Sequence, residues 1–93
     1  MPLHFEWDEK KARSNTEKHG VLFEDAATIF ADALSLTIPD PRHSQAEDRF
    51  VTIGHSNRGK LLVVVHTDRG NKIRIIIARP ASRRERRSYE EVS

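Results

Sequence analysis

The spacing of apolar residues predicts one strand and two helices in the first third of the chain. Apolar and polar side chains alternate over residues 3–7, which is the period of a half-buried strand. Residues 9–19 are mostly polar and lie between Asp8, a suitable N-cap, and Gly20, a residue that often follows the last turn of a helix. Residues 23–30 carry apolar side chains at positions i, i+3, i+4 and i+7, which predicts a helix with one buried face.

Four more strands and a final helix complete the predicted order, β-α-α-β-β-β-β-α. Apolar alternation indicates strands over residues 34–38 and 49–54. Residues 61–65 and 73–77 are continuously apolar, so we expect them to pair as antiparallel strands at the centre of a sheet, buried on both faces. The last helix is expected to begin at Pro80, because proline is tolerated in the first turn of a helix.

This order of elements is typical of a compact α+β domain with a mainly antiparallel sheet, and residues 1–93 are expected to form a single domain. The chain has no cysteine, which excludes a disulfide framework and a thiolate metal site. Its amino-terminal segment lacks the apolar stretch of a signal peptide, and no apolar run is long enough to span a bilayer. We therefore expect a cytoplasmic protein with no membrane partner.

The charged residues are unevenly distributed along the chain. Residues 1–50 carry 6 Lys and Arg against 10 Asp and Glu, a net charge of −4, whereas residues 51–93 carry 10 against 4, a net charge of +6. Most of the arginines of the second half follow residue 73, and guanidinium groups form paired hydrogen bonds with phosphates. This asymmetry predicts that a polyanion such as nucleic acid binds at the C-terminal end. The alternative is that both halves simply present solvated charges.

The residues that we expect to carry out chemistry lie at the ends of the later strands: Glu47, Arg49, His66 and Arg79. An imidazole titrates near neutral pH, so His66 is a candidate for proton exchange; the alternative is a structural histidine that bonds a backbone carbonyl. Glu47 and Arg49 stand two residues apart on one side of a strand. The carboxylate there could act as a base, orient the histidine or simply pair with Arg49. Arg49 and Arg79 are the candidates for contacting a phosphate.

The final helix is predicted to have a basic face and a second face that can pack. The candidates for RNA binding are Arg74, Arg83, Arg86, Arg87 and Tyr89. The basic face could equally be a solvated helix surface. Tyr89 could stack on a base, although a lone tyrosine on an apolar face is more often part of a core. Glu85 lies on the packing face and is expected to pair with Arg74 or Arg79, because a half-buried carboxylate without a partner is costly.

The histidines are scattered without the short spacings of metal sites, so we expect no metal and no cofactor. Arginines together with a histidine or a carboxylate suffice for metal-independent cleavage of RNA, because the neighbouring 2′-hydroxyl is the nucleophile. The protein then has to place the phosphate, neutralise its developing charge and exchange protons. This combination favours an endoribonuclease. The alternative is a non-catalytic module that binds an acidic partner or nucleic acid through the same arginines.

Several spaced motifs resemble one known family over nearly the whole chain. They are Phe5-Glu6-Trp7-Asp8, Asn15, Lys18-His19-Gly20, Phe23, Ala26, Phe30, Glu47-Asp48-Arg49 before Gly54, Arg74-Ile75-Ile76-Ile77-Ala78-Arg79, Glu85-Arg86 and Tyr89. In this combination the chain resembles the BrnT family of bacterial type II toxins. It departs from the family pattern at Leu22, where a small polar residue is common, and at Ile77, where serine is common. Neither departure changes the assignment.

The resemblance implies a RelE-like α+β fold and a ribonuclease that arrests translation. It also implies a cognate BrnA-type antitoxin with a ribbon-helix-helix DNA-binding region, encoded alongside the toxin. A toxin dimer within a heterotetramer would repress its own operon, so operator DNA would be contacted only through the antitoxin. RelE-like enzymes differ widely in their catalytic residues, so the resemblance does not assign the groups that act in this chain. A homologue that has lost activity and serves only as a co-repressor fits the same sequence.

Overall fold

A five-stranded sheet and three α-helices form the part of the chain that the computed structural model describes, residues 3–40 and 48–92. In chain order, the elements are β1 (His4–Glu6), α1 (Glu9–His19), α2 (Phe23–Ala27), the 3₁₀ helix η1 (Thr28–Ala31), β2 (Leu36–Pro39), β3 (Arg49–His55), β4 (Leu61–Arg69), β5 (Lys72–Pro80) and α3 (Arg83–Val92). The strand order across the sheet is β1-β5-β4-β3-β2, and neighbouring strands are antiparallel except for the parallel pair of β1 and β5. The predicted α+β class and the predicted order of elements are confirmed.

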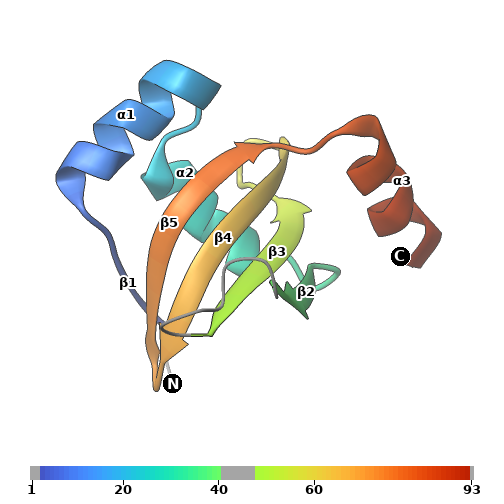
Figure 1. The fold of residues 1–93 in the computed structure, drawn as a ribbon. Helices are drawn as coiled ribbons and strands as arrows, with labels where there is room; N and C mark the ends of the chain where they lie inside the picture. Colours follow the sequence, from blue (N-terminus) through green and yellow to red (C-terminus); the bar gives the residue numbers. More distant parts are fainter. Residues whose placement is uncertain (1–2, 41–47, 93) are drawn as a thin grey trace.

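Among the described helices, α2 and η1 pack against the same face of the sheet. In Figure 1, α2 and η1 lie behind the sheet, α1 runs along the side of β5, and α3 stands apart on the side of β3 and β2. Successive residues of a strand point to opposite faces, so every second residue of the central strands faces away from α2 and η1. We call this side the open face; it carries Val51, Val63, Val65 and Ile77.

The core lies between the sheet and the helices α2 and η1. Phe23 and Ile29 of these helices share one buried cluster with Leu62 and Val64 of β4 and with Ile75 of β5. All five side chains are essentially inaccessible to water, and the burial of each contributes about 1.5–3 kcal/mol to stability. The apolar pattern that predicted the second helix therefore identified its buried face, although the second half of that segment is a 3₁₀ helix.

The side chain of Asn15 in α1 forms hydrogen bonds with the backbone of β5 of the kind that a neighbouring strand would form. β1 pairs with β5 only as far as Arg74, so no described strand lies beside the following residues of β5 on that side. The buried Asn15 side chain accepts a hydrogen bond from the Ala78 N–H at 3.0 Å and donates one to the Ala78 carbonyl at 2.8 Å. It also donates to the carbonyl of Val21 at 3.0 Å. Because buried backbone groups need partners, this amide fixes α1 against the sheet.

The last helix begins later than the sequence predicted. Pro80 is the final residue of β5 and pairs with Leu62; proline is tolerated there because a strand end loses only one hydrogen-bond donor. The helix α3 begins after Ser82. The Ser82 hydroxyl accepts a hydrogen bond from the Glu85 N–H at 3.2 Å, and the Glu85 carboxylate accepts one from the Ser82 N–H at 2.8 Å. This reciprocal capping sets the start of the helix.

The strand β5 is not buried on both faces as predicted, because Ile77 is 37% exposed on the open face. The register between β4 and β5 shifts next to Val65 and leaves Ile76 without a direct partner, which is a β-bulge. After the bulge, Ile77 lies opposite Val65, and Arg79 lies opposite Val63. The extra residue therefore turns the Arg79 side chain toward the open face.

Candidate functional site

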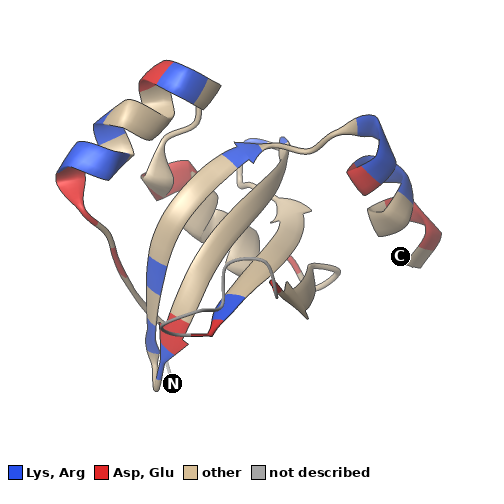
Figure 2. Cartoon of the chain, viewed as in Figure 1, with Lys and Arg blue, Asp and Glu red and all other residues tan. Residues whose placement is uncertain are grey.

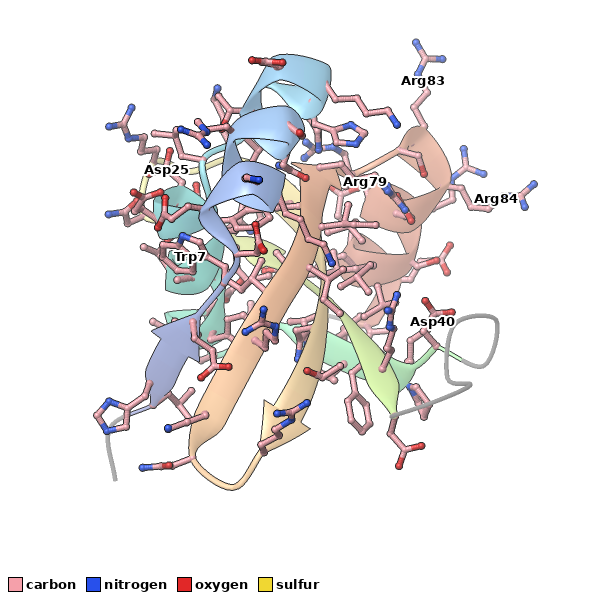
Figure 3. The ribbon with its side chains drawn as sticks, turned by 60° about the vertical axis from the view of Figure 1, so that its left-hand side comes forward. Trp7, Asp25, Asp40, Arg79, Arg83 and Arg84 are labelled. Atoms are coloured by element: carbon pink, nitrogen blue, oxygen red, sulfur yellow. The ribbon has the colours of Figure 1, made fainter. Side chains whose placement is uncertain are left out.

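A groove of about 470 Å³ crosses the open face, and we call it the sheet groove. Its floor is apolar and consists of Ile38, Val51, Val63, Val65 and Ile77. Arg49 and Asp40 border one end, and Arg79 and Glu85 border the other. Figure 3 shows Arg79 near the top of β5 and Asp40 close to β2. An apolar concavity with a few charged groups at its rim is typical of a ligand site.

Strand register places Arg49 and Arg79 at opposite ends of the sheet groove. Arg49 of β3 pairs with Thr67 of β4, whereas Arg79 of β5 pairs with Val63. Thr67 and Val63 are four residues apart on one strand, a separation of about 13 Å. Extended arginine side chains from both ends can reach a chain molecule that lies along the groove. The structure thus brings these two predicted residues to one surface.

Arg74 lies in the same row of the sheet as Arg49. Both are paired with Thr67, from its two neighbouring strands. The Thr67 hydroxyl is buried and has no hydrogen-bond partner among the described residues. Arg74 Nη1 donates to Glu6 Oε2 at 3.1 Å, and both of these side chains are more than a third exposed, so the pair is worth about 1 kcal/mol at most.

Arg79 and Glu85 form an ion pair with two hydrogen bonds. The Arg79 Nη1 and Nη2 groups each donate to one Glu85 oxygen at 2.7 Å. These bonds raise the pKa of Arg79 and lower the pKa of Glu85 to about 2. The sequence left open whether Glu85 pairs with Arg74 or with Arg79, and the structure shows that it is Arg79. A guanidinium group held in this way still has further N–H donors.

Arg83, Arg86 and Arg87 are exposed on α3, together with Arg84. Figure 2 shows the positive residues gathered on the first turns of α3, and Figure 3 shows Arg83 and Arg84 reaching outward from the helix. Within residues 3–40 and 48–92, no carboxylate forms an ion pair with any of these four arginines. Because Glu85 connects the same helix to Arg79, this positive surface begins beside one end of the sheet groove.

His66 lies on the other face of the sheet from Arg49 and Arg79. It is 1% exposed and packs against the ring of Phe30, with ring centroids 4.9 Å apart. Its Nε2 atom is 2.7 Å from the Thr52 hydroxyl, and its Nδ1 atom is 2.6 Å from an Asp68 carboxylate oxygen. Both ring nitrogens are therefore occupied under the helices. The structure does not bring His66 to the predicted catalytic arginines.

Tyr89 anchors α3 and does not line the sheet groove. It is 4% exposed, and its hydroxyl donates to Asp32 Oδ2 at 2.7 Å and lies 3.1 Å from His55 Nδ1. The pKa of Asp32 is lowered, mainly by the hydrogen bond from the His55 backbone N–H. A ring buried in this cluster is not available for stacking on a base, so the structure favours the alternative that Tyr89 belongs to a packed interface.

Glu47 lies outside the described residues. Sequence reasoning missed Asp40 and Thr67, which border or adjoin the sheet groove. Thr67 could have been found from strand alternation, because it follows Val63 and Val65 at steps of two residues on the same face. Asp40 lies beyond the strand predicted over residues 34–38, and only the pairing of β2 with β3 brings it beside Arg49.

No group of three or more His, Asp or Glu side chains within residues 3–40 and 48–92 is placed to hold a metal ion. No described helix is both long enough and apolar enough to cross a membrane.

Comparison with known proteins assigns the family. A family model described as "Ribonuclease toxin, BrnT, of type II toxin-antitoxin system" matches residues 7–85. The chain belongs to the BrnT family. The 1.1 Å crystal structure of the Brucella abortus ribonuclease toxin BrnT matches this fold with a TM-score of 0.68; the two sequences are 27% identical, and the match covers 87% of this chain and 99% of that chain. No curated protein sequence matches the chain.

Membership of the BrnT family confirms the resemblance that the spaced motifs indicated. BrnT-family proteins are ribonuclease toxins of type II toxin–antitoxin systems. The family therefore implies RNA as the target and an antitoxin as the partner. The sheet groove of this BrnT-family chain has arginines at both ends, and guanidinium groups form paired hydrogen bonds with phosphates.

Proposed function

We propose that this BrnT-family chain is a metal-independent endoribonuclease and that the sheet groove is its active site. The observation that carries the proposal is that Arg49 and Arg79 border one groove with an apolar floor. Guanidinium groups bind phosphates through paired hydrogen bonds, and the floor offers apolar contact to a nucleotide base. An RNA strand in the groove would have its backbone within reach of both arginines.

Arg49 and Arg79 would contact the phosphate that is cleaved. The neighbouring 2′-hydroxyl attacks the phosphorus atom and the 5′-oxygen leaves, so one proton is taken from the hydroxyl and one is given to the leaving oxygen. Fixed cations stabilise the negative charge that develops on the phosphate oxygens. The ion pair with Glu85 supports this role, because it orients the Arg79 guanidinium and leaves other N–H donors for the phosphate.

A carboxylate at the groove is proposed for proton exchange in place of His66. Asp40 borders the sheet groove at the Arg49 end. Glu85 is a poor base at neutral pH, because its pKa is lowered to about 2. Glu47 remains a second candidate on the basis of its sequence position alone. His66, with both ring nitrogens bonded on the opposite face, is proposed to stabilise the fold.

The other arginines would hold the phosphates that flank the cleavage site. Arg74 lies across Thr67 from Arg49, in the same row of the sheet. Arg83, Arg86 and Arg87 extend the positive surface beyond Arg79 along α3. Contacts of this kind do not depend on base sequence, so they would supply affinity and position rather than selectivity.

Control of the toxin is proposed to follow the pattern that the family resemblance implies. A BrnA-type antitoxin with a ribbon-helix-helix region would neutralise the ribonuclease in the cytoplasm. A toxin dimer within a heterotetramer with this antitoxin would repress the operon, and only the antitoxin would contact operator DNA. Membership in a type II toxin–antitoxin family supports a dedicated protein partner.

The proposal is tested with purified protein and with cells. Protein incubated with total RNA and a chelator is expected to degrade the RNA; persistent intact RNA at micromolar protein would contradict the enzyme assignment. Degradation that stops on chelation would contradict metal independence alone. Expression in a bacterial host is expected to arrest growth, and co-expression of the neighbouring reading frame is expected to restore it.

A non-catalytic binding module is the second candidate. It is favoured by the ion pairs that already occupy Arg74 and Arg79 and by the position of His66 away from the groove. Such a protein, or an inactive homologue that acts as a co-repressor, would bind RNA or an acidic partner through the same arginines. It would leave the RNA intact in the incubation described above.

A further inference from the structure

A second groove, of about 400 Å³, lies between α1 and β5, and we call it the helix groove. Its polar rim is provided by Lys10, Lys11, Lys18 and His19 of α1, and its apolar side by Ile76 and Ile77 of β5. None of the described residues that line it is acidic. A groove of this size with three lysines is suited to a negatively charged ligand.

The cations of the helix groove have not been neutralised within the fold. Among the described residues, no carboxylate forms an ion pair with Lys10, Lys11, Lys18 or His19. The acidic residues of this region line a different hollow, on the far side of α1, where Glu9, Glu17 and Glu24 share the lining with Arg13. The helix therefore separates its charges and directs the unpaired positive ones toward β5.

The helix groove adjoins the sheet groove. Ile77 lines both of them, because the β-bulge turns this residue outward at the edge of β5. Figure 2 shows positive residues on α1, at the upper end of β5 and on α3, and Figure 3 shows Arg79 between α1 and α3. One surface thus leads from the lysines of α1 across Ile77 to the floor of the sheet groove.

We propose that the helix groove binds the phosphates of the single-stranded RNA segment next to the cleavage site. Lys10 and Lys18 are eight residues apart on one helix, which is about 12 Å along its axis, so they can contact different phosphates of one strand. This spacing fits a polymer rather than a mononucleotide or a free phosphate ion. Lysine supplies adaptable point charges for a backbone, and Ile76 and Ile77 offer apolar contact to sugars and bases.

This inference rests on the proposed function, because it assigns a further substrate contact to the same ribonuclease. An acidic segment of a protein partner is the competing occupant. RNA is favoured because the two grooves meet at Ile77, so a strand that lies in the sheet groove can extend into the helix groove. The sequence motif Lys18-His19-Gly20, which contributes two of the lining side chains, is used by no step of the cleavage chemistry proposed above.

The test measures binding of a non-cleavable RNA, a single strand with 2′-O-methyl groups at every position, at several salt concentrations. The Lys11→Gln/Lys18→Gln variant removes two positive charges and keeps side-chain length. The slope of log affinity against log salt concentration is expected to become less negative by about 1.4, which corresponds to two lost phosphate contacts. Affinity near 0.1 M salt should fall by on the order of tenfold.

Arg13→Gln is the matched control, because it removes a positive charge from the far side of the same helix. Its salt dependence and affinity are expected to equal those of the unaltered protein, whereas the single variant Lys18→Gln should lose about half of the effect of the double variant. Thermal unfolding should be similar for all variants, because Lys11, Arg13 and Lys18 are exposed.

An unchanged salt slope in the double variant would overturn the proposal, as would an equal loss in Arg13→Gln. Loss of antitoxin co-purification with unchanged RNA binding would also overturn it and assign the helix groove to the protein partner. The binding probe needs no cleavage, so the two proposals fail separately. If the unaltered protein does not cleave RNA but the double variant has a shallower salt slope, the ribonuclease is rejected and the RNA-binding site is retained. If the unaltered protein cleaves RNA and the slope of the double variant is unchanged, the ribonuclease is retained and the RNA-binding site is rejected.

Discussion

Hydrogen-bond partners decide what each charged or titratable side chain of the sheet can do. Arg79 and His66 stand on neighbouring strands and face opposite sides. The carboxylate of Glu85 holds Arg79 at the rim of a groove, where part of its guanidinium group can meet a ligand. Both ring nitrogens of His66 form hydrogen bonds, one with Thr52 and one with Asp68, and its ring packs on the other face of the sheet. The first side chain is therefore available for binding, and the second is committed to the fold.

Replacement of His66 by alanine is expected to destabilise the protein. The substitution leaves a cavity under Phe30 and removes one hydrogen-bond partner from each of Thr52 and Asp68, so the free energy of unfolding should fall by about 3 kcal/mol in urea titrations. His4→Ala, at an exposed position of β1, is the control and should change it by less than about 0.5 kcal/mol. A well-folded His66→Ala protein that had lost RNA cleavage would instead restore the catalytic role predicted from the sequence.

The ion pair of Arg79 and Glu85 makes stability depend on pH. The pKa of Glu85 is lowered from 4.5 in the unfolded protein to about 2 in the folded protein. The ion pair therefore contributes fully to stability at pH values above 4.5, and this contribution is lost as the pH falls through about 2. After allowance for solvent screening of a partly exposed pair, this contribution is about 1 kcal/mol. The free energies of unfolding of the unaltered protein and of Glu85→Gln, compared from about pH 6 down to about pH 2, should converge at the acidic end. A constant difference would show that the charge of Glu85 is not the cause.

Two helices are each tied to the sheet by a small number of side-chain hydrogen bonds. Asn15 joins α1 to the backbone of β5, and Tyr89 joins α3 to Asp32 and His55. Isolated helices of ten or eleven residues are marginal in water, so these connections determine whether each helix stays in place. Both helices also carry the cations proposed to bind RNA.

Replacement of Asn15 by alanine is expected to cost about 2–4 kcal/mol, because the Ala78 N–H and the carbonyls of Ala78 and Val21 lose a buried partner. Chemical denaturation measures the loss. Asn15→Asp is an informative comparison, since a carboxylate can accept from the Ala78 N–H but cannot donate to either carbonyl. Ser14→Ala, one residue earlier and exposed, should be nearly neutral. Equal stability of Asn15→Ala and Ser14→Ala would refute the proposed role of Asn15.

Replacement of Tyr89 by phenylalanine is expected to loosen α3 while the sheet stays intact. The ring still packs, but Asp32 loses the hydroxyl donor at 2.7 Å, so the local free energy of opening should fall by about 1 kcal/mol. Hydrogen exchange of the amides in α3 should accelerate several-fold, and exchange in β4 should not change. Ser88→Ala, at an exposed site of the same helix, is the control. Faster exchange throughout the sheet would show that Tyr89 supports the whole fold.

Across the whole molecule, the open face of the sheet unites residues from distant parts of the chain. The sheet groove takes its walls from β2, β3, β4, β5 and α3, and its charged ends from Arg49 and Arg79. The helices on the other face supply the core that keeps these strands in register. One side of the sheet thus packs against the core, and the other side carries the groove that we propose binds RNA.

Replacement of Arg49 by glutamine is expected to reduce RNA cleavage by about 10²–10³-fold, because one of the cations that stabilise the transition state is removed. The free energy of unfolding should change by less than about 1 kcal/mol. Arg58→Gln is the matched control: this arginine is 69% exposed, lies in the turn before β4, and does not border the sheet groove. Equal cleavage by both variants would remove Arg49 from the proposed site.

The sequence by itself determined the features that depend on neighbouring residues. Side-chain capping by Asp8 and the left-handed conformation of Gly20 set both ends of α1, and the predicted bounds of that helix agree with the structure. Alternation and apolar runs located the strands of the described residues, and the spaced motifs identified the family. These signals are local or additive along the chain, so they can be read without knowing which segments meet.

The tertiary structure alone decided which side chains share a face. A continuously apolar strand gives no sign of its orientation, and a single extra residue, Ile76, reverses every side chain that follows it in β5. This bulge sends Arg79 to the open face, whereas the alternation of β4 sends His66 to the core. The partner of Glu85 and the meeting of α1 with β5 depend in the same way on contacts between distant segments, and no spacing along the chain records them.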